Sequence, residues 1–268
     1  MELSHRSVLI TGAGSGIGRA LAVGLARYGT RQVLVGRRGH LLMETAVCVR
    51  DAGGEAETVM GDITDDAVRT QALQTAVETH GGLDILVNNA GCLAAGRLER
   101  MSVEDIRRQI EVDLIAPILL TRDAIPLLRR SDDAVIVNMS SAVALIAIAF
   151  YSPYVASKAG MALFSESLRR ELYGEGIHVM AVYPNATRTP MMDTTSAGPE
   201  LGFDYEPPEA VAEAIIAGLC EGAVEVVRDA DRRAAMLEAN RNRPAEVDAR
   251  ISRKKHLLEA AVANHRSM

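Results

Sequence analysis

A tyrosine and a lysine stand four residues apart at Tyr154 and Lys158. If this segment is helical, their side chains lie on one face of the helix. A neighbouring ammonium group favours phenolate over phenol, so we expect the pKa of Tyr154 to lie below its ordinary value of about 10. Lys158 is the only lysine before residue 254, in a chain that otherwise takes its positive charge from arginine. The pair therefore predicts a tyrosine that acts as a general acid or base.

A hydroxyl group beside that tyrosine could hold a substrate oxygen. Ser141 lies just after the strand-like run 135–139 and before Tyr154. Ser140 is an equally suitable donor by residue type, and either serine could simply cap the end of a strand. The pattern favours Ser141 only in combination with the tyrosine and lysine.

A glycine-rich turn follows the first strand-like run, residues 7–11. It contains Gly12, Gly14, Gly16 and Gly18, with Ser15 and Ile17 between them. A strand, a tight turn and the start of a helix form an anion site, because backbone N–H groups and the positive end of the helix face the ligand. The spacing, TGxxxGxG, differs from the GxGxxG fingerprint. It predicts a site for the pyrophosphate of a dinucleotide, the alternative being a glycine-rich loop without a ligand.

Two arginines follow the second strand-like run, residues 32–35. An Asp or Glu at this place would bind the ribose 2′-hydroxyl of NAD. Arg37 and Arg38 stand there instead, and guanidinium groups suit a phosphate. We therefore expect NADP(H) rather than NAD(H). Two solvated arginines are the alternative.

The elements that must position these groups alternate along the chain. Short β-branched runs are expected to be strands and the periodic segments between them helices. The strands are predicted at 7–11, 32–35, 55–60, 83–88, 134–139, 178–183 and 224–227, and the helices at 17–28, 40–52, 65–80, 103–130, 154–173 and 208–221. Nearly all-apolar strands and this alternation predict a doubly wound α/β fold with a seven-stranded parallel sheet, the Rossmann arrangement.

Composition narrows the class of protein. The chain has 268 residues, a formal charge of −6 and an apolar fraction of 48%, which excludes a disordered chain. Its longest apolar run, residues 142–150, is far too short to cross a membrane. Three scattered cysteines predict neither disulfides nor a metal site, and few aromatic residues with an acidic balance argue against nucleic-acid binding. We expect a cytoplasmic protein.

Two segments interrupt the alternation. Residues 185–206 have no clear period and follow the end of a strand, which favours a lid over the substrate. From residue 228 to the end, ten Lys or Arg stand against six Asp or Glu, a local charge of +4. We expect a catalytic domain over residues 1–228 and a helical extension over 229–268 that packs on the body or on another subunit. A solvated helix is the simpler interpretation of its charge, and a docking surface the alternative.

Taken together, these motifs resemble the short-chain dehydrogenase/reductase family over about residues 7–227. Ser141, Tyr154 and Lys158 match the catalytic residues of that family. The resemblance implies that Tyr154 exchanges a proton, that Lys158 lowers its pKa and binds the nicotinamide ribose, and that Ser141 positions the substrate oxygen. Further cofactor contacts are implied for Asp62, Ile63, Asn88, Asn89, Ala90, Gly91, Pro184, Thr187 and Thr189.

The sequence departs from the family pattern at a few positions. Asp113 stands where the family usually has an Asn that holds a water near the lysine, and we count Asp113 among the catalytic residues with an altered proton relay. Asn185 replaces the Gly that usually follows Pro184. Ala144 replaces another frequent Gly and is expected to narrow the substrate pocket.

The predicted function is an NADP(H)-dependent oxidoreductase that transfers a hydride between the nicotinamide and a carbonyl or secondary alcohol. Val143 and Met191, with Ser141 and Tyr154, are expected to contact a small, mainly apolar substrate; residues 143–150 could equally be core or subunit interface. An NADP(H)-binding redox sensor or scaffold with decayed catalysis is the alternative. The family resemblance also implies a homodimer or homotetramer.

Overall fold

A parallel sheet of seven strands forms the centre of the molecule. The computed structural model describes residues 1–268, and the strand order in the sheet is β3-β2-β1-β4-β6-β7-β8. The strands are β1 (Ser7–Thr11), β2 (Arg31–Gly36), β3 (Glu55–Met60), β4 (Ile85–Asn88), β6 (Ala134–Met139), β7 (Ile177–Tyr183) and β8 (Glu225–Val227). The predicted doubly wound fold is confirmed. The direction of winding reverses between β1 and β4, and open α/β sheets bind ligands at the carboxyl ends of the strands at such a point.

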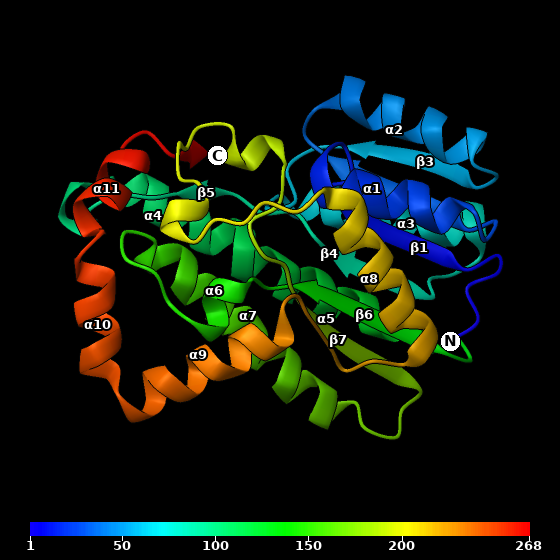
Figure 1. Cartoon of the computed structure of the whole chain (residues 1–268). Coiled ribbons are helices and arrows are strands. Elements are labelled where there is room, and N and C mark those ends of the chain that lie inside the picture. Colours follow the sequence, from blue (N-terminus) through cyan, green and yellow to red (C-terminus); the bar gives the residue numbers. More distant parts are fainter.

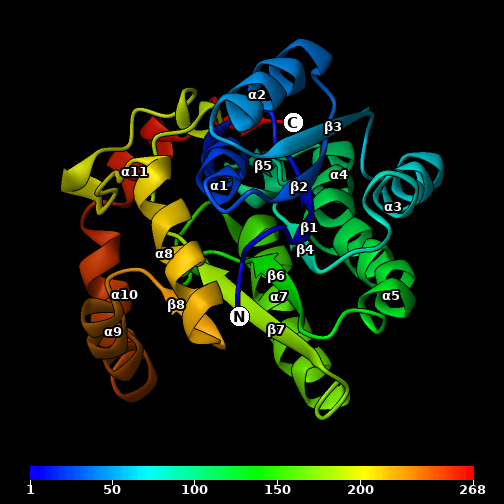
Figure 2. The same ribbon diagram turned by 90° about the vertical axis from the view of Figure 1, so that its right-hand side faces the viewer.

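Helices cover both faces of the sheet. They are α1 (Gly16–Ala26), α2 (Gly39–Asp51), α3 (Asp66–His80), α5 (Ala116–Leu128), α7 (Ser152–Glu171) and α8 (Pro208–Glu221). One core layer includes residues of α1, α2 and α8, and the other includes residues of α3, α5 and α7. Figure 2 shows α1 and α8 on one side of the sheet and α3 and α5 on the other. Because successive strand residues point to opposite faces, Val8 and Ile10 belong to the first layer and Leu9 to the second.

A chain of buried polar side chains fixes α7 against the sheet. Asn88 Nδ2 donates to Asn138 Oδ1 at 2.8 Å and to Thr121 Oγ1 at 2.9 Å. Asn138 Nδ2 in turn donates to the hydroxyl of Ser165 on α7 at 2.9 Å. An unpaired buried polar group costs free energy, so these bonds favour one position of the helix that carries Tyr154 and Lys158.

The helix predicted over 103–130 is divided. It consists of α4 (Val103–Ile110), a π-helical turn η2 (Glu111–Ile115) and α5. The wider turn places Asp113 inside the protein, where it is 1% exposed. Such turns are frequent at functional sites, and periodicity alone does not distinguish one from an ordinary helix.

Loop segments surround the carboxyl ends of the strands. They contain the short helix α6 (Ala142–Leu145) and the single 3₁₀ turns η1 (Leu98–Arg100), η3 (Pro190–Met192) and η4 (Pro199–Leu201). Phe150, at the end of the apolar run, has a φ of 71°. This left-handed backbone is unusual for a bulky residue, and it lies directly before Tyr151, which reaches the cavity described below.

The last forty residues form helices and then return to the body as a strand. Helices α9 (Ala230–Asn242), α10 (Pro244–Ser252) and α11 (Lys255–Ala261) curve around one end of the molecule (Figure 1). Strand β9 (Arg266–Ser267) then pairs antiparallel with β5 (Leu93–Ala94). The helical extension was predicted and this closing strand was not. The division into 1–228 and 229–268 stays a prediction, which limited proteolysis would test.

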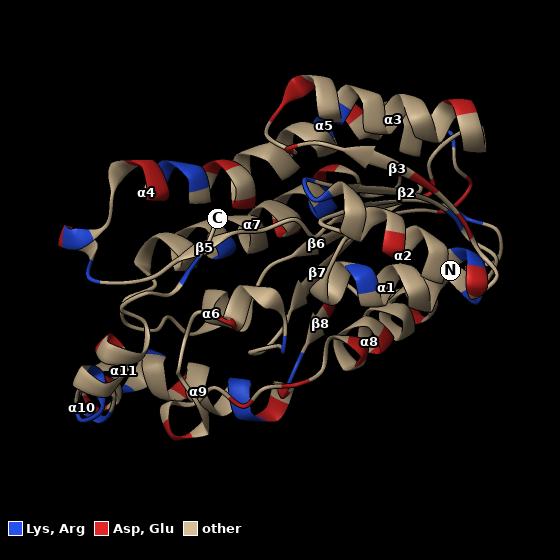
Figure 3. Cartoon of the chain, turned by 90° about the horizontal axis from the view of Figure 1, so that it is seen from above, with Lys and Arg blue, Asp and Glu red and all other residues tan.

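Basic and acidic residues are mixed in the extension, and Figure 3 shows both kinds on α9. Arg228 pairs with Glu206 at 2.9 Å and Arg232 with Asp204 at 2.7 Å. Lys254 Nζ donates to the carbonyl of Glu200 at 2.6 Å. These three contacts hold the end of the predicted lid, residues 185–206, against residues 228–254. No helix of the protein has both the length and the apolar character that a membrane crossing needs.

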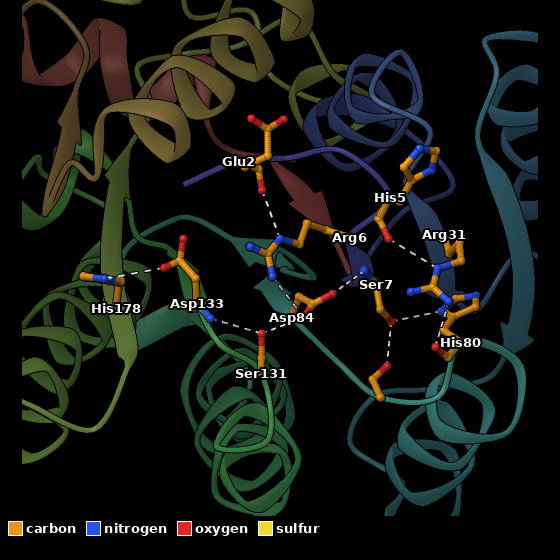
Figure 4. A network of polar contacts seen from close by, with 11 residues as sticks. Glu2, His5, Arg6, Ser7, Arg31, His80, Asp84, Ser131, Asp133 and His178 are labelled. Atoms are coloured by element: carbon orange, nitrogen blue, oxygen red, sulfur yellow. Dashed lines mark hydrogen bonds and ion pairs between the residues drawn. The ribbon is translucent and has the colours of Figure 1, made fainter.

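A polar network lies at the opposite end of the sheet, where the strands begin (Figure 4). Asp84 accepts the backbone N–H of Ser7 at 2.7 Å and the hydroxyl of Ser131 at 2.6 Å. The Ser7 hydroxyl donates to the carbonyl of Gly82 and lies 3.0 Å from Nδ1 of the buried His80. Burial, assisted by the charge of Arg31, lowers the pKa of His80.

We expect His80 to make the folded state sensitive to acid. The unfolded chain takes up the proton more readily than the folded protein, so the free energy of unfolding should fall as the pH drops through about 6.5. Urea unfolding at pH 7.5 and 5.5 measures this loss, which His80→Gln should reduce. The control His178→Gln, at an exposed histidine, should keep it. An equal pH dependence in wild type and His80→Gln would contradict the expectation.

Candidate active site

A cavity of about 640 Å³ opens at the carboxyl ends of the central strands. Residues of several segments line it: the glycine turn, the ends of β2, β4 and β6, the start of α7, the 184–206 segment and the chain's last three residues. Predicted site residues that line it are Gly12, Gly14, Ser15, Gly16, Ile17, Arg37, Arg38, Asp62, Ile63, Asn89, Ala90, Gly91, Ser141, Val143, Tyr154, Lys158, Pro184, Thr187, Thr189 and Met191. Gly18, Asn88 and Asp113 are outside this lining and lie behind it.

The glycine turn is held by the end of β4. The Thr11 hydroxyl accepts the backbone N–H groups of Asn89 and Ala90, both at 2.9 Å, and Asn89 Nδ2 donates to the carbonyl of Thr11 at 2.8 Å. A Cβ added at Gly18 would lie 2.4 Å from Asn89 Nδ2 and 2.5 Å from Gly12 O, so only glycine fits there. Gly18 thus has a packing role, as the rear support of the turn.

The first turn of α1 is suited to an anion. It contains no acidic residue, and its N-cap Ser15 makes no capping bond with its side chain. The Ser15 hydroxyl instead accepts a hydrogen bond of 2.8 Å from Arg38 Nη2. Free backbone N–H groups, the helix dipole and a guanidinium therefore converge on one part of the cavity. These residues fit the pyrophosphate of a dinucleotide.

The two arginines and Asp62 lie at the same end of the cavity. Arg37 Nη2 donates to the backbone carbonyl of Met268 at 2.9 Å, so the returning chain end borders the predicted 2′-phosphate site. Asp62 pairs with Arg108 on α4 and accepts the Thr64 hydroxyl at 2.8 Å. Burial alone would raise the pKa of Asp62, but the hydrogen bonds from Thr64 and Arg108 bring it below its ordinary value.

Tyr154 and Lys158 face the same space, as their spacing predicts. The Lys158 ammonium lies 5.6 Å from the centre of the Tyr154 ring and donates to the carbonyl of Met139 at 3.1 Å. The Ser140 hydroxyl is used within the protein, because it donates to the carbonyl of Lys158 at 2.8 Å. Ser141 caps α6, where its hydroxyl accepts a long 3.3 Å bond from Val143 N–H, and it also interacts with the Tyr154 phenol. This geometry favours Ser141 over Ser140.

The expected lowering of the Tyr154 pKa is not what this structure gives. Burial raises the pKa of Tyr154, the carboxylate of Asp113 raises it further, and the interaction with Ser141 lowers it only in part. The spacing of Tyr154 and Lys158 indicates the neighbouring positive charge, but it contains no information on burial or on the carboxylate of Asp113. The phenol is therefore held in its protonated form.

Asp113 lies under the cavity floor, beside the lysine. Its Oδ1 accepts the backbone N–H of Cys92 at 2.8 Å, and its Oδ2 lies 3.9 Å from Lys158 Nζ and 3.5 Å from the Ser157 hydroxyl. A Cβ added at Gly91 would lie 3.3 Å from Asp113 Oδ1 and 3.6 Å from Lys158 Nζ, so Gly91 covers both groups closely. Burial raises the pKa of Asp113, and the lysine charge opposes that rise.

The substrate end of the cavity is apolar, with two buried polar groups at its edge. Its wall includes Val143, Ile146, Ile148, Met191, Met192, Leu201 and Phe203. Residues 148–151 also pack with the extension, through Leu258 and Val262. The hydroxyl of the buried Tyr151 has no partner, and the same holds for Nε2 of His265, whose ring lies edge-on to that of Tyr151. Burial lowers the pKa of His265 to about 4, so its imidazole is neutral at pH 7.

Several cavity residues were not predicted. They include Arg108, Arg233 and the closing residues Arg266, Ser267 and Met268. Arg266 pairs with Asp105 on α4, and its backbone N–H donates to the Thr194 hydroxyl at 3.1 Å. No local pattern relates the chain end to a site more than a hundred residues earlier, so sequence spacing contained no signal for them.

The fold and the site together define a dinucleotide-dependent oxidoreductase: a glycine turn at the switch point of a parallel sheet, with a tyrosine, a lysine and a serine beside it. Comparison with known proteins gives the family. The family model of the short chain dehydrogenases matches residues 6–200. The chain belongs to the short-chain dehydrogenase/reductase family, whose members use nicotinamide cofactors and act on C=O or CH–OH groups.

Individual relatives cover most of the chain. An uncharacterized oxidoreductase of Thermotoga maritima is 38% identical over 70% of this chain and 74% of its own length. A ketoacyl reductase, HetN, of Nostoc is 32% identical over 84% of this chain and 79% of its own. The 3beta-hydroxysteroid dehydrogenase 1 of Eggerthella lenta is 33% identical over 74% and 77%, respectively.

Proposed function

We propose that this protein is an NADP(H)-dependent carbonyl reductase or alcohol dehydrogenase for a small, mainly apolar substrate. The observation that carries the proposal is the meeting of Tyr154, Ser141 and Lys158 in one cavity, which they share with the glycine turn and whose substrate end is apolar. Arg37 and Arg38 support the choice of NADP(H), because they bring two guanidinium groups to the place where an NAD-binding protein carries an acid.

The residues of the glycine turn, the arginines, Asp62, Asn89 and the 184–189 segment would hold the cofactor. When bound, the cofactor supplies or accepts the hydride. Ser141 orients the substrate oxygen towards Tyr154, and the tyrosine hydroxyl gives that oxygen its proton as the alcohol forms. A phenol whose pKa is raised stays protonated at neutral pH, so the donor is present before the reaction begins. Lys158 holds positive charge beside the phenolate that remains.

Asp113 has a different part in this scheme, because it does not line the cavity. Its carboxylate neutralises part of the Lys158 charge and raises the pKa of Tyr154 through the field it exerts. It therefore acts on the proton transfer through its neighbours, in place of the water-holding Asn that the family resemblance implied.

We expect Asp113→Asn to shift the pH profile of alcohol oxidation, which requires the tyrosine without its proton. Removing the negative charge favours the phenolate, so the rising limb should move to lower pH while the KM for cofactor changes little. The pH dependence of kcat/KM measures the shift. The control Asp123→Asn, at a surface carboxylate on α5, should leave the profile in place. If the pH profiles of kcat/KM were identical for Asp113→Asn and wild type, Asp113 would have no effect on the proton transfer.

A panel of ketones, aldehydes and secondary alcohols, followed by the absorbance of NADPH, tests the proposal. A kcat/KM that is higher with NADPH than with NADH supports the proposal. A higher kcat/KM with NADH would overturn the cofactor assignment. Tight binding of NADPH without turnover of any compound would favour the redox sensor or scaffold. Assembly into a dimer or tetramer and a cytoplasmic location stay predictions.

A further inference from the structure

The C-terminal extension contributes a cation to the cavity. Arg233 lies on the first turns of α9 and lines the same space as Ser141, Val143 and Tyr154. Helix α9 is in contact with α6, the short helix that Ser141 caps. Figure 1 shows α9 near α6. A residue far from the catalytic segment in sequence is thus placed at the substrate side of the site.

The positive charge of Arg233 has no counter-ion in the protein. Two other arginines near it in the sequence are matched, Arg228 by Glu206 and Arg232 by Asp204. The one hydrogen bond of the Arg233 guanidinium goes from Nη2 to the neutral amide oxygen of Asn185, and its Nε is buried without a partner. The nearby carboxylate of Asp229 accepts the amide of Asn185 at 2.8 Å and forms no ion pair with Arg233.

An unmatched guanidinium in this position is costly to the protein alone. A partly buried charge loses hydration, and only a partner charge or hydrogen bonds restore the difference. Burial lowers the pKa of Arg233, the charge of Arg232 lowers it further, and Asp229 opposes both only in part. The group remains charged at neutral pH. An anion in the cavity would supply the missing partner.

We propose that Arg233 binds a carboxylate of the substrate, so that the substrate is an acid with an apolar segment between its carboxylate and its reacting carbonyl or alcohol. This inference rests on the proposed function and names its substrate class. The apolar wall formed by Val143, Met191 and Phe203 suits the intervening segment. A single guanidinium with Asp229 nearby suits a group with one negative charge better than a doubly charged phosphate.

The carboxylate site is tested first by activity. A series of straight-chain oxo acids, with the oxo group at successive positions, is compared with the corresponding methyl esters using NADPH. Because hydrogen bonds to charged groups are the stronger ones, the wild type should prefer the best acid over its ester by about 10- to 100-fold in kcat/KM. Arg233→Gln should abolish that preference by slowing the acid, and Arg233→Lys should retain part of it.

The matched control is Arg241→Gln, which removes an exposed arginine of the same helix that lies outside the cavity and should preserve the preference for acids. Equal rates of the wild type with acids and esters would overturn the inference. So would an Arg233→Gln variant that slows acids and esters equally, or one that changes only the KM for NADPH.

A binding measurement separates this inference from the proposed function. Calorimetry with saturated straight-chain carboxylic acids, which contain no reacting group, requires no turnover. Wild type and Arg241→Gln in the presence of NADPH should bind such an acid about 10- to 100-fold more tightly than Arg233→Gln. Selective binding without turnover of any oxo acid would support Arg233 and refute the proposed reaction. Turnover of neutral carbonyls with no selective binding of acids would do the reverse.

Discussion

Tyr154→Phe should lower kcat for carbonyl reduction by about 10³-fold, within the range of roughly 10²- to 10⁴-fold that a positioned proton donor contributes. The phenylalanine ring keeps the packing against Tyr151 and the face presented to Lys158. Only the hydroxyl is removed, so the dissociation constant for NADPH should change by less than about threefold, because the cofactor is held mainly by other residues. Steady-state kinetics on the best substrate, with fluorescence titration of NADPH, measures both quantities.

The chain offers a matched control for this change. Tyr173, just beyond the end of α7, is 88% exposed, and Tyr173→Phe removes the same hydroxyl group outside the cavity. Its kinetics should equal those of wild type. If Tyr154→Phe kept more than a tenth of wild-type kcat, another group would have to supply the proton, and the proposed mechanism would fail.

The second large effect concerns cofactor choice. Replacing Arg37 and Arg38 together by alanine should lower kcat/KM for NADPH by about 10²- to 10⁴-fold, because each guanidinium is expected to make a charge-assisted bond worth about 1.5–3 kcal/mol. The value for NADH should change far less, since NADH lacks the 2′-phosphate. The ratio of kcat/KM for the two cofactors isolates this effect from any general loss of activity.

The structure shows why the two arginines should be separated in this experiment. Arg38 also bonds Ser15 in the glycine turn, whereas Arg37 bonds the backbone of Met268. Arg38→Ala alone should therefore weaken NADH somewhat as well, through the turn, and Arg37→Ala should act on NADPH almost alone. Arg27→Ala, at an exposed arginine at the far end of α1, is the control. If the double variant lost kcat/KM equally with NADPH and NADH, the two arginines would not bind the 2′-phosphate.

Much of the site could be predicted because its signals are local. The turn from Gly12 to Gly18 needs only a strand before it and a helix after it, and the pair Tyr154 and Lys158 needs only a helical repeat. Short apolar runs that alternate along the chain with helical segments likewise predict the strands. The interruption around Asp113 could not be predicted in this way, because the π-helical turn is an adjustment of one helix to its tertiary neighbours, including Cys92 and Lys158.

The amino-acid sequence by itself determined the individual strands, the glycine turn and the shared face of Tyr154 and Lys158, since each depends on residues within a few positions of one another. Only the tertiary structure decided the direction of the Tyr154 pKa shift, because burial and a carboxylate distant in sequence set it. It also decided that Arg233 and the chain end border the cavity. Such contacts depend on how distant segments pack, and residue spacing along the chain contains no measure of that packing.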